Sequence, residues 1–533
     1  MARSFLIIFL HILTAVCLAQ APVQKKKPNI IIILADDMGY SDIGCFGSEI
    51  QTPQLDGLAK EGLRMTQFYN AARCCPTRAS LLTGIYQHQA GVGHMVNERP
   101  IPAYQGFLSE NCVTIAEVLK ENGYKTYMAG KWHVGEKRPH WPLDRGFDRY
   151  FGLINGANSY FGLRPYRPNQ KLTIALDNEP VQPGEGYYAT DAYTDYAMKF
   201  MDENKGSGKP FFLYLAFQAP HWPLHALKDD IARYKDRYKE GWDKIREERF
   251  NRMKEIGILG NNAKLSERNE KVPAWNTLAQ TDKDRWADKM AVYAAMVDRM
   301  DQNIGRLRRK LEELGEDKNT MILFLSDNGG SYERVGGPGF TPEIIAANQL
   351  PASDSSSFTA YEFPGANVSN TPFRYFKRYV YEGGIATPFI AYFPGLIKQG
   401  INSNQSAHIT DIMATCLDVA GVSYPKTYKG HNITPAEGTS LKPLFEGKNW
   451  KRKDAIFFEH EGNRAVRLGD WKIVSEYPSN KWQLYNLKTD RSEITDLSAQ
   501  FPKKVAELAA LYDKWAKRAG VVPFAQIDTG ARD

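Results

Sequence analysis

The sequence predicts an α/β fold in which helices flank a large, mostly parallel sheet and a small antiparallel sheet follows at the C-terminus. Four apolar runs, several of them β-branched, have the composition of parallel strands that are buried on both faces. A long segment before the fourth run carries apolar residues at alternating spacings of four and three, which indicates a helix packed on the sheet. After Trp450 the chain changes to short strands and a terminal helix.

The predicted strands of the large sheet lead directly into polar residues. The strands are residues 29–34, 124–129, 211–217 and 321–325. The polar segments that follow them are Asp36-Asp37, Gly130-Lys131-Trp132-His133, Ala219-Pro220-His221 and Ser326-Asp327-Asn328-Gly329-Gly330. Because ligands bind outside the carboxyl ends of the strands in an open α/β sheet, we expect these segments to converge on one crevice.

The predicted long helix lies between the third and fourth strands, after a charged stretch at residues 228–284. Its apolar stripe consists of Trp286, Met290, Tyr293, Val297, Met300, Ile304, Leu307 and Leu311. Gly315 is placed to end the helix. Because the stripe covers one face only, we expect the helix to pack in the core of this chain and not in a coiled coil with a partner.

The C-terminal part is expected to form a small subdomain. Its predicted strands are residues 455–458, 464–467, 471–475 and 482–485, and its helix is residues 502–518. We therefore predict a main α/β domain at residues 28–450 and a subdomain at residues 451–533, whose antiparallel sheet and helix pack on the main domain.

The N-terminus has the features of a cleaved secretory signal peptide. Arg3 precedes an apolar stretch from Phe5 to Leu18, and the small residue Ala19 follows. Residues 1–19 are therefore predicted to be removed, and the mature protein is expected to be secreted or periplasmic. No later run approaches the length of a membrane-spanning helix.

Composition limits the classes of partner. The 533 residues include 68 Lys and Arg against 61 Asp and Glu, for a net charge of +7. This mild excess suits an anionic substrate, but it is equally the profile of a solvated surface. No basic block or nucleic-acid motif is present, so no nucleic-acid partner is expected. The irregular spacing of Cys45, Cys75, Cys112 and Cys416 does not define a disulfide framework.

The run from Cys74 to Gly84, CCPTRASLLTG, is the most informative part of the chain. Pro76 suits the first turn of a helix and Gly84 suits its end, so Cys74 is expected at the positive N-terminal end, next to Arg78. Such a position favours anions. The alternative interpretation is an ordinary Pro-initiated helix preceded by buried or disulfide-bonded thiols.

A second candidate site consists of oxygen ligands. Asp36, Asp37, Asp327 and Asn328 offer only oxygen atoms, which favours a hard cation, Ca²⁺ ahead of Mg²⁺, over Zn²⁺ or Cu²⁺. Either pair alone is more typical of a turn or a helix cap. Two pairs after two buried strands favour a metal site, because clustered carboxylates need a countercharge.

Several motifs resemble those of the sulfatase family. The run at Cys74 matches the signature C-x-P-x-R-x-x-x-L-T-G at every defined position, and Gly123-Tyr124-Lys125-Thr126 with Gly130-Lys131-Trp132-His133 resembles the second signature. The segments at 219–224 and 370–384 are similar to bacterial-type arylsulfatases. The resemblance covers residues 28 to about 500. It implies an alkaline-phosphatase-like sandwich, with residues 28–450 as the catalytic domain.

The resemblance also implies a cofactor and a modified residue. Cys74, and not Cys75, would be converted to formylglycine (3-oxoalanine) by a formylglycine-generating or sulfatase-maturing enzyme. One Ca²⁺ ion would be held by Asp36, Asp37, Asp327, Asn328 and an oxygen of the modified residue at position 74.

The remaining roles are carried over by matched position. Lys131, His221 and Lys377 would hold the sulfate oxygens, whereas Arg78 and His133 would hold the formylglycine hydrate. One hydroxyl of that hydrate would attack sulfur, with Asp327 as the candidate base. His221 or Lys377 would protonate the leaving alcohol, and His133 would take the proton of the second hydroxyl so that sulfate is expelled.

Three functions are consistent with these residues. The first is Ca²⁺-dependent hydrolysis of aryl or carbohydrate sulfate monoesters. The second is a phosphonate monoester or phosphodiester hydrolase of the same superfamily, which the missing extra His/Asp cluster disfavours. The third is an unmatured protein that only binds sulfated glycans. Residues 353–370, which lie just before Lys377, are predicted to be the substrate-selecting loop. His88, His94 and His225 are predicted to serve in loops or packing.

Overall fold

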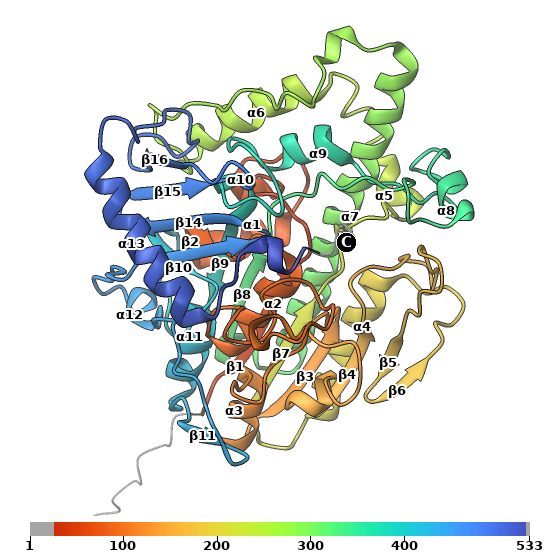
Figure 1. The fold of residues 1–533 in the computed structure, drawn as a ribbon. Helices are drawn as coiled ribbons and strands as arrows, with labels where there is room; N and C mark the ends of the chain where they lie inside the picture. The colour runs from red at the N-terminus through yellow and green to blue at the C-terminus, as the bar shows by residue number, and fades with distance from the viewer. Residues whose placement is uncertain (1–25, 529–533) are drawn as a thin grey trace, which may run out of the picture.

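The computed structural model describes residues 26–528, and the predicted signal peptide lies outside the described residues. The chain forms a large sheet covered by helices on both faces, with a small sheet and helix α13 (Pro502–Ala519) beside it (Figure 1). Within the described residues, no helix is long and apolar enough to cross a membrane. The α/β class and the small C-terminal antiparallel sheet are confirmed.

The large sheet has ten strands in the order β10-β2-β9-β8-β1-β7-β3-β4-β5-β6. Their bounds are β1 Asn29–Ala35, β2 Leu63–Tyr69, β3 Lys125–Gly130, β4 Arg149–Leu153, β5 Ile174–Leu176, β6 Glu179–Val181, β7 Phe211–Ala216, β8 Thr320–Ser326, β9 Ala386–Tyr392 and β10 Ile401–His408. The five consecutive strands β8, β1, β7, β3 and β4 are parallel to one another. β9 runs antiparallel between β2 and β8, so the sheet is mixed.

Strand β1 lies at the centre of the sheet. It pairs with β7 on one side and with β8 on the other, and all seven of its residues are buried. Ile31 and Ile33 point into one apolar cluster, whereas Ile30 and Ile32 belong to a second cluster on the opposite face. The continuous apolar run is thus explained by helices on both sides.

Different helices cover the two faces. One face packs against α1 (Pro53–Glu61), α4 (Ala189–Glu203) and α7 (Gln280–Glu313). The other packs against α2 (Cys74–Thr83), α3 (Ile115–Glu121) and α11 (Asp411–Ala420). The arrangement brings α2 to the carboxyl edge of the sheet, because Arg78 of α2 contacts Asp327 after β8 and the carbonyl of Lys131 after β3.

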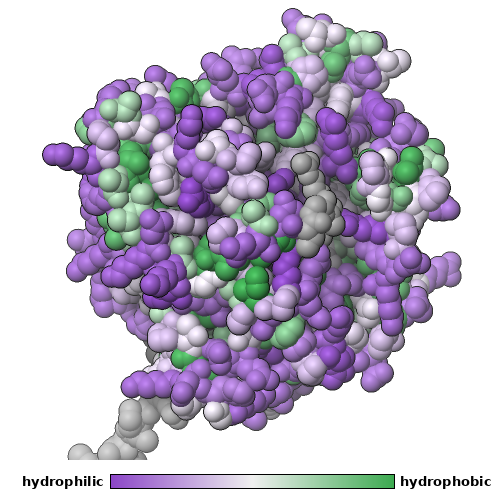
Figure 2. Space-filling view, in the orientation of Figure 1, coloured by the Kyte–Doolittle hydropathy of each residue, from purple (hydrophilic) through white to green (hydrophobic). Residues whose placement is uncertain are grey.

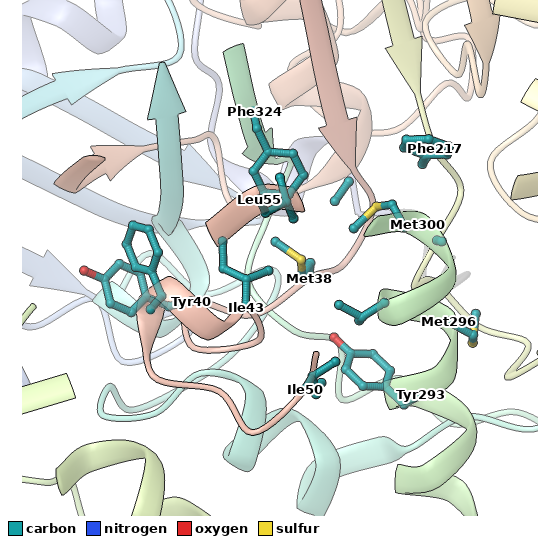
Figure 3. Packing of buried hydrophobic residues seen from close by; sticks show 14 of the residues in the cluster. Met38, Tyr40, Ile43, Ile50, Leu55, Phe217, Tyr293, Met296, Met300 and Phe324 are labelled. Atoms are coloured by element: carbon teal, nitrogen blue, oxygen red, sulfur yellow. The ribbon is translucent and has the colours of Figure 1, made fainter. Parts of the chain in front are cut away.

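Helix α7 carries the predicted stripe. Tyr293 and Met300 are fully buried and pack near Met38 and Ile43, which follow β1 (Figure 3). The helix begins before the first stripe residue, and Trp286 is only half-buried. The prediction of a core helix is therefore correct, although the sequence pattern underestimates its length.

The C-terminal sheet contains β13 (Ile456–His460), β14 (Asn463–Leu468), β15 (Trp471–Ser475) and β16 (Trp482–Asn486), all antiparallel. Helix α13 lies across this sheet (Figure 1). The domain boundary at 450 remains a prediction.

A buried ionic cluster joins the small sheet to the main sheet. Lys472 Nζ of β15 lies 3.0 Å from Glu382 Oε1 and 2.8 Å from Glu493 Oε1. Glu382 belongs to α10 (Glu382–Ile385), which leads into β9. The three side chains are fully buried, so the pairs are shielded from solvent.

The predicted loop at 353–370 is only partly a loop. Its second half is helix α9 (Glu362–Ser369), in which Phe363 to Ser369 are buried. Tyr361 packs flat against Tyr293 of α7, so this segment is held in the core. Burial of the apolar residues Phe363, Ala366 and Val368 explains why the segment folds back instead of remaining open.

The visible surface is largely hydrophilic, with hydrophobic residues scattered among charged ones (Figure 2). Among the described residues, the exposed large hydrophobic side chains are Ile345, Leu350, Ile494 and Phe501.

Candidate active site

The polar segments after β1, β3, β7 and β8 lie together at the carboxyl edge of the sheet. They contribute Asp36, Lys131, His221 and Asp327 to one buried cluster. The cluster arises because these four strands are parallel neighbours, so their ends coincide. Lys377 enters it from the segment between α9 and α10.

Helix α2 brings the signature to this edge. Cys74 is its first residue, after the extended Arg73, and Gly84 ends it with a φ of 70° in the left-handed region. Pro76 lies in the first turn, where backbone N–H groups make no intrahelical hydrogen bond, so the missing N–H of proline costs no bond. The thiol of Cys74 is therefore at the helix end that carries partial positive charge.

Arg78 links α2 to the end of β8. Its Nε and Nη2 donate to Asp327 Oδ2 at 3.1 and 2.8 Å, and its Nη1 donates to the carbonyl of Lys131 at 2.8 Å. Arg78 and Asp327 are completely buried. Burial and the charge of Asp36 raise the pKa of the Asp327 carboxyl, against the opposing effect of Arg78.

Lys131 forms a second buried pair. Its Nζ donates to Asp36 Oδ2 at 2.5 Å, and both side chains are fully buried. Although burial by itself lowers it, the pKa of Lys131 is raised because Asp36 and Cys74 place negative charge beside the ammonium. Lys131 thus stays protonated in the site.

Asp37 is held between β1 and Lys377 in an uncommon backbone conformation. Its φ is 65°, and its Oδ1 accepts a hydrogen bond from Asn328 Nδ2 at 2.6 Å. Lys377 Nζ donates to Asp37 Oδ2 at 3.0 Å, and His221 Nε2 lies 3.4 Å from the same oxygen. A left-handed conformation in a non-glycine residue is costly and is concentrated at functional sites.

The oxygen atoms fit a cation. Asp36 Oδ1 and Asn328 Oδ1 are buried and have no hydrogen-bond partner among the described residues. One donor atom from each of Asp36, Asp37 and His221 lies within 4.8 Å of the others. Burial is the largest effect on Asp36 and raises its pKa, whereas Lys131 and Arg78 lower it and the carboxylate of Asp37 raises it. Carboxylate and amide oxygens with unsatisfied lone pairs are suited to a hard ion such as Ca²⁺.

Cys74 lies beside a second thiol and a histidine. Cys75 Sγ is 3.4 Å from His133 Nε2, and one donor atom each of Cys74, Cys75 and His133 lies within 4.8 Å of the others. A hydrogen bond from Cys75 is the main reason that the pKa of Cys74 is far below its usual value. Burial lowers the pKa of His133 to about 4, so its imidazole is neutral.

Gly156 makes room for His133. A Cβ atom at position 156 would lie 2.4 Å from Cε1 and Nε2 of the imidazole. His133 itself has a φ of 56°. The glycine therefore permits a close approach that any side chain would block. No sequence signal pointed to this residue.

Glu333 was also missed by the sequence analysis. Its Oε2 accepts hydrogen bonds from Lys377 Nζ at 3.0 Å and from Trp222 Nε1 at 2.8 Å, and its Oε1 lies 3.1 Å from Arg73 Nη1. Lys377 and Arg73 outweigh the effect of burial and lower the pKa of Glu333. Glu333 is thus an ionised partner for the Lys377 ammonium.

The three histidines predicted to serve in loops or packing make structural contacts. His88 Nε2 lies 2.8 Å from Glu459 Oε2, and His225 Nε2 lies 2.8 Å from the carbonyl of Ser357. His94 stacks with Phe524. Within residues 26–528, all cysteines are free thiols.

The comparisons with known proteins agree with this arrangement. A family model described as Sulfatase matches residues 28–422, and one described as N-sulphoglucosamine sulphohydrolase, C-terminal, matches residues 372–515. The chain belongs to the sulfatase family. As a sulfatase it is a sulfuric ester hydrolase.

Relatives of this sulfatase cover almost the whole chain. An uncharacterized sulfatase of Schizosaccharomyces pombe is 34% identical over 537 residues, covering 94% of this chain and 95% of the relative. An arylsulfatase of Klebsiella aerogenes is 34% identical over 447 residues, covering 81% of this chain and 94% of the relative. The solved structure of Ps i-CgsB with k-i-k-neocarrahexaose has 27% sequence identity and a TM-score of 0.67, covering 92% of this chain and 93% of that chain.

Proposed function

We propose that this sulfatase hydrolyses sulfate monoesters of phenols or carbohydrates to an alcohol and inorganic sulfate, with a formylglycine hydrate at position 74 as nucleophile and one bound Ca²⁺. The observation that carries the proposal is the placement of Cys74 at the N-terminus of α2, within a buried cluster of Arg78, Lys131 and Lys377. Three permanent cations beside a reactive position suit an anionic ester.

Asp36, Asp37, Asp327 and Asn328 would hold the Ca²⁺ ion together with residue 74. The unpartnered oxygens of Asp36 and Asn328 support this assignment. When bound, the ion would polarise the nucleophile and neutralise charge on the sulfuryl group.

The sulfate oxygens would be held by Lys131, His221 and Lys377. Lys131 and Lys377 are fixed by carboxylates, at 2.5 Å to Asp36 and 3.0 Å to Asp37. Donors that are already oriented in a dry pocket stabilise a developing charge without reorganising. The pocket is therefore arranged for an anion before the substrate arrives.

Protons would move through three side chains. Asp327, whose pKa is raised by burial, would accept the proton of the attacking hydroxyl. His221 Nδ1 lies 2.6 Å from the carbonyl of Trp222, which can only accept, and burial lowers the pKa of His221 to about 4. The neutral ring therefore carries its proton on Nδ1, and Lys377, whose Nζ is 3.5 Å from His221 Nε2, would protonate the leaving oxygen. His133, neutral at physiological pH, would accept the proton of the second hydroxyl.

The substrate class proposed here is aryl and carbohydrate sulfates. It is supported by the names of two relatives, the arylsulfatase of Klebsiella aerogenes and the N-acetylgalactosamine-6-sulfatase of Homo sapiens, which is 27% identical over 484 residues. We also propose that the chain is exported through its N-terminal signal and that a maturing enzyme converts Cys74.

The test requires protein that carries formylglycine, verified by mass spectrometry of the tryptic peptide Cys74–Arg78. Sulfate release from nitrophenyl sulfate and from a panel of sulfated sugars is then compared with hydrolysis of bis-nitrophenyl phosphate. We expect faster turnover of at least one sulfate ester. Faster hydrolysis of the phosphodiester than of every sulfate ester would overturn the proposal.

A further inference from the structure

Cys75 has no role in the proposed reaction, yet it lies inside the site. It is fully buried, 3.4 Å from His133 Nε2 and 3.7 Å from Met95 Sδ. In the unconverted chain, Cys74 adds a second thiol within 4.8 Å of the same imidazole. Three soft or borderline ligands thus come from the start of α2 and the segment after β3, with a thioether beside them.

We propose that the unconverted chain binds one thiophilic cation, Cu(I), through Cys74 Sγ, Cys75 Sγ and one ring nitrogen of His133. Thiolate and thioether sulfur favour Cu(I) and Zn²⁺ over hard cations, and imidazole is compatible with both, so the surrounding charge decides between them. The proposal concerns the precursor and does not depend on which ester the mature enzyme hydrolyses.

A metal ion binds cysteine as thiolate and histidine as neutral imidazole. Binding of Cu(I) would therefore release the proton of each thiol that is protonated in the free chain.

The surrounding charges favour a monovalent ion. Two thiolates and Cu(I) carry a net charge of −1, whereas two thiolates and a divalent ion are neutral. Lys131 and Arg73 both place positive charge near Cys75. Lys131 is also paired with Asp36 at 2.5 Å and Arg73 with Glu333 at 3.1 Å, so these cations favour the complex with one negative charge over the neutral one by a reduced amount.

Met95 offers an approach route to the three ligands. It is half-buried, in contrast to the buried thiols, and Arg73 Nε donates to its sulfur at 3.3 Å. A thioether that reaches both solvent and Cys75 would capture Cu(I) and pass it inward.

Conversion of Cys74 would abolish the site. The aldehyde or its hydrate replaces a thiolate by oxygen, which leaves one thiol and one imidazole. The same pocket would then favour the hard Ca²⁺ ion on the Asp36 side and lose the soft ion on the Cys75 side. Residue 74 therefore decides which metal the pocket selects.

The experiment uses full-length protein produced without a maturing enzyme and shown by mass spectrometry to retain Cys74. Under anaerobic conditions, Cu(I) is titrated in competition with bathocuproine disulfonate. We expect one Cu(I) per chain, and we expect Cys75→Ser and His133→Ala each to weaken binding by at least about 10- to 100-fold. Cys45→Ser, which removes a half-buried thiol elsewhere, is the matched control and should bind as the wild type does.

The converted wild type provides a comparison that needs no substitution, since it has the same fold. It should not compete for Cu(I). Circular dichroism and thermal unfolding establish whether each variant is folded. If Cys75→Ser is not folded, the proposal is tested by comparing the converted with the unconverted wild type. Failure of the unconverted wild type to bind Cu(I), or equal binding by the converted protein or by folded Cys75→Ser, would overturn the proposal. Sulfate-ester turnover is measured separately on converted protein, so the two proposals fail independently.

Discussion

Arg78 donates two hydrogen bonds to a single oxygen of Asp327, from Nε at 3.1 Å and from Nη2 at 2.8 Å. The two residues are 249 positions apart, and both are fully buried. This pair fixes α2 to the end of β8. Residue 74, the proposed nucleophile, and a predicted metal ligand are thus positioned by one contact.

Replacing Arg78 by Lys should lower kcat/KM by roughly 10²- to 10³-fold, because a single ammonium cannot reproduce the fork of donors. Kinetics on converted protein measures the effect. Arg308→Lys is the control, since Arg308 pairs with Glu61 at the surface and should tolerate the change. Unchanged kinetics in Arg78→Lys would mean that the fork has no catalytic importance.

Asp327→Ala should remove a proposed Ca²⁺ ligand and the candidate base together. We expect activity to fall by more than the roughly 10²- to 10³-fold typical of one lost oxyanion donor, and bound Ca²⁺ to fall with it. Elemental analysis and kinetics are the measurements. Asp282→Ala changes an exposed carboxylate in the first turn of α7 and should affect neither. Full Ca²⁺ occupancy with near-normal turnover would exclude Asp327 from the site.

Glu333→Gln should weaken the fixation of Lys377, since the amide removes the charge that faces its ammonium at 3.0 Å. The expected result is a fall in kcat/KM of roughly 10-fold. Steady-state kinetics across pH checks it, because loss of this anion should also shift the alkaline limb to lower pH. Glu362→Gln, which alters the Lys289 pair outside the site, is the matched control. A pH profile identical to that of the wild type would contradict the role of Glu333.

Cys74→Ser should trap the enzyme after one turnover in a host that does not convert serine. The serine hydroxyl retains an oxygen nucleophile but lacks the second hydroxyl that expels sulfate. Intact mass should rise by one sulfo group after incubation with substrate, while steady turnover is abolished. Multiple turnovers by unmodified Cys74→Ser would disprove the elimination step.

Stability should fall in acid because of buried neutral histidines. Burial lowers the pKa of His225 to about 4, so the unfolded chain binds this proton below the ordinary pKa of about 6.5 and the native protein does not. The contribution of neutral His225 to the free energy of unfolding is complete above pH 6.5 and is lost as the pH falls toward 4. His225→Gln should therefore reduce the slope of unfolding free energy against pH by about 1.4 kcal/mol per unit near pH 5.

Urea unfolding of wild type and His225→Gln at pH 5, 6 and 7 measures this difference. His431→Gln, which removes a partly exposed histidine paired with Glu110, controls for loss of a histidine as such. Equal slopes in wild type and His225→Gln would show that His225 is protonated in the native protein.

The strands that sequence patterns predicted are those buried on both faces. β1, β7 and β8 are continuous apolar runs, so their composition alone indicates that they are buried. The missed strands lie nearer the edges, and β10 has the polar sequence INSNQSAH. Such a strand forms because β2 offers a ladder partner, and pairing of distant segments is not visible in a local pattern.

The candidate site likewise contains residues that the sequence predicts and residues that it does not. Residues that follow predicted strands, such as Asp36 and Asp327, could be grouped from the sequence because parallel strands end together. Glu333 and Gly156 could not, since each acts through a side chain that is distant in sequence, Lys377 and His133 respectively. Their importance depends on packing that only the folded chain defines.

The burial of Cys74 has a consequence for biosynthesis. The residue is 2% exposed, and the cluster around it includes residues whose charges act on it, Asp327 and Lys377, which leave the ribosome later than Cys74 does. Another protein can reach this thiol only while the chain is still being made or has not yet closed. Under the proposed function, Cys74 would therefore have to be converted before the chain folds. A chain that folds first would keep its thiol.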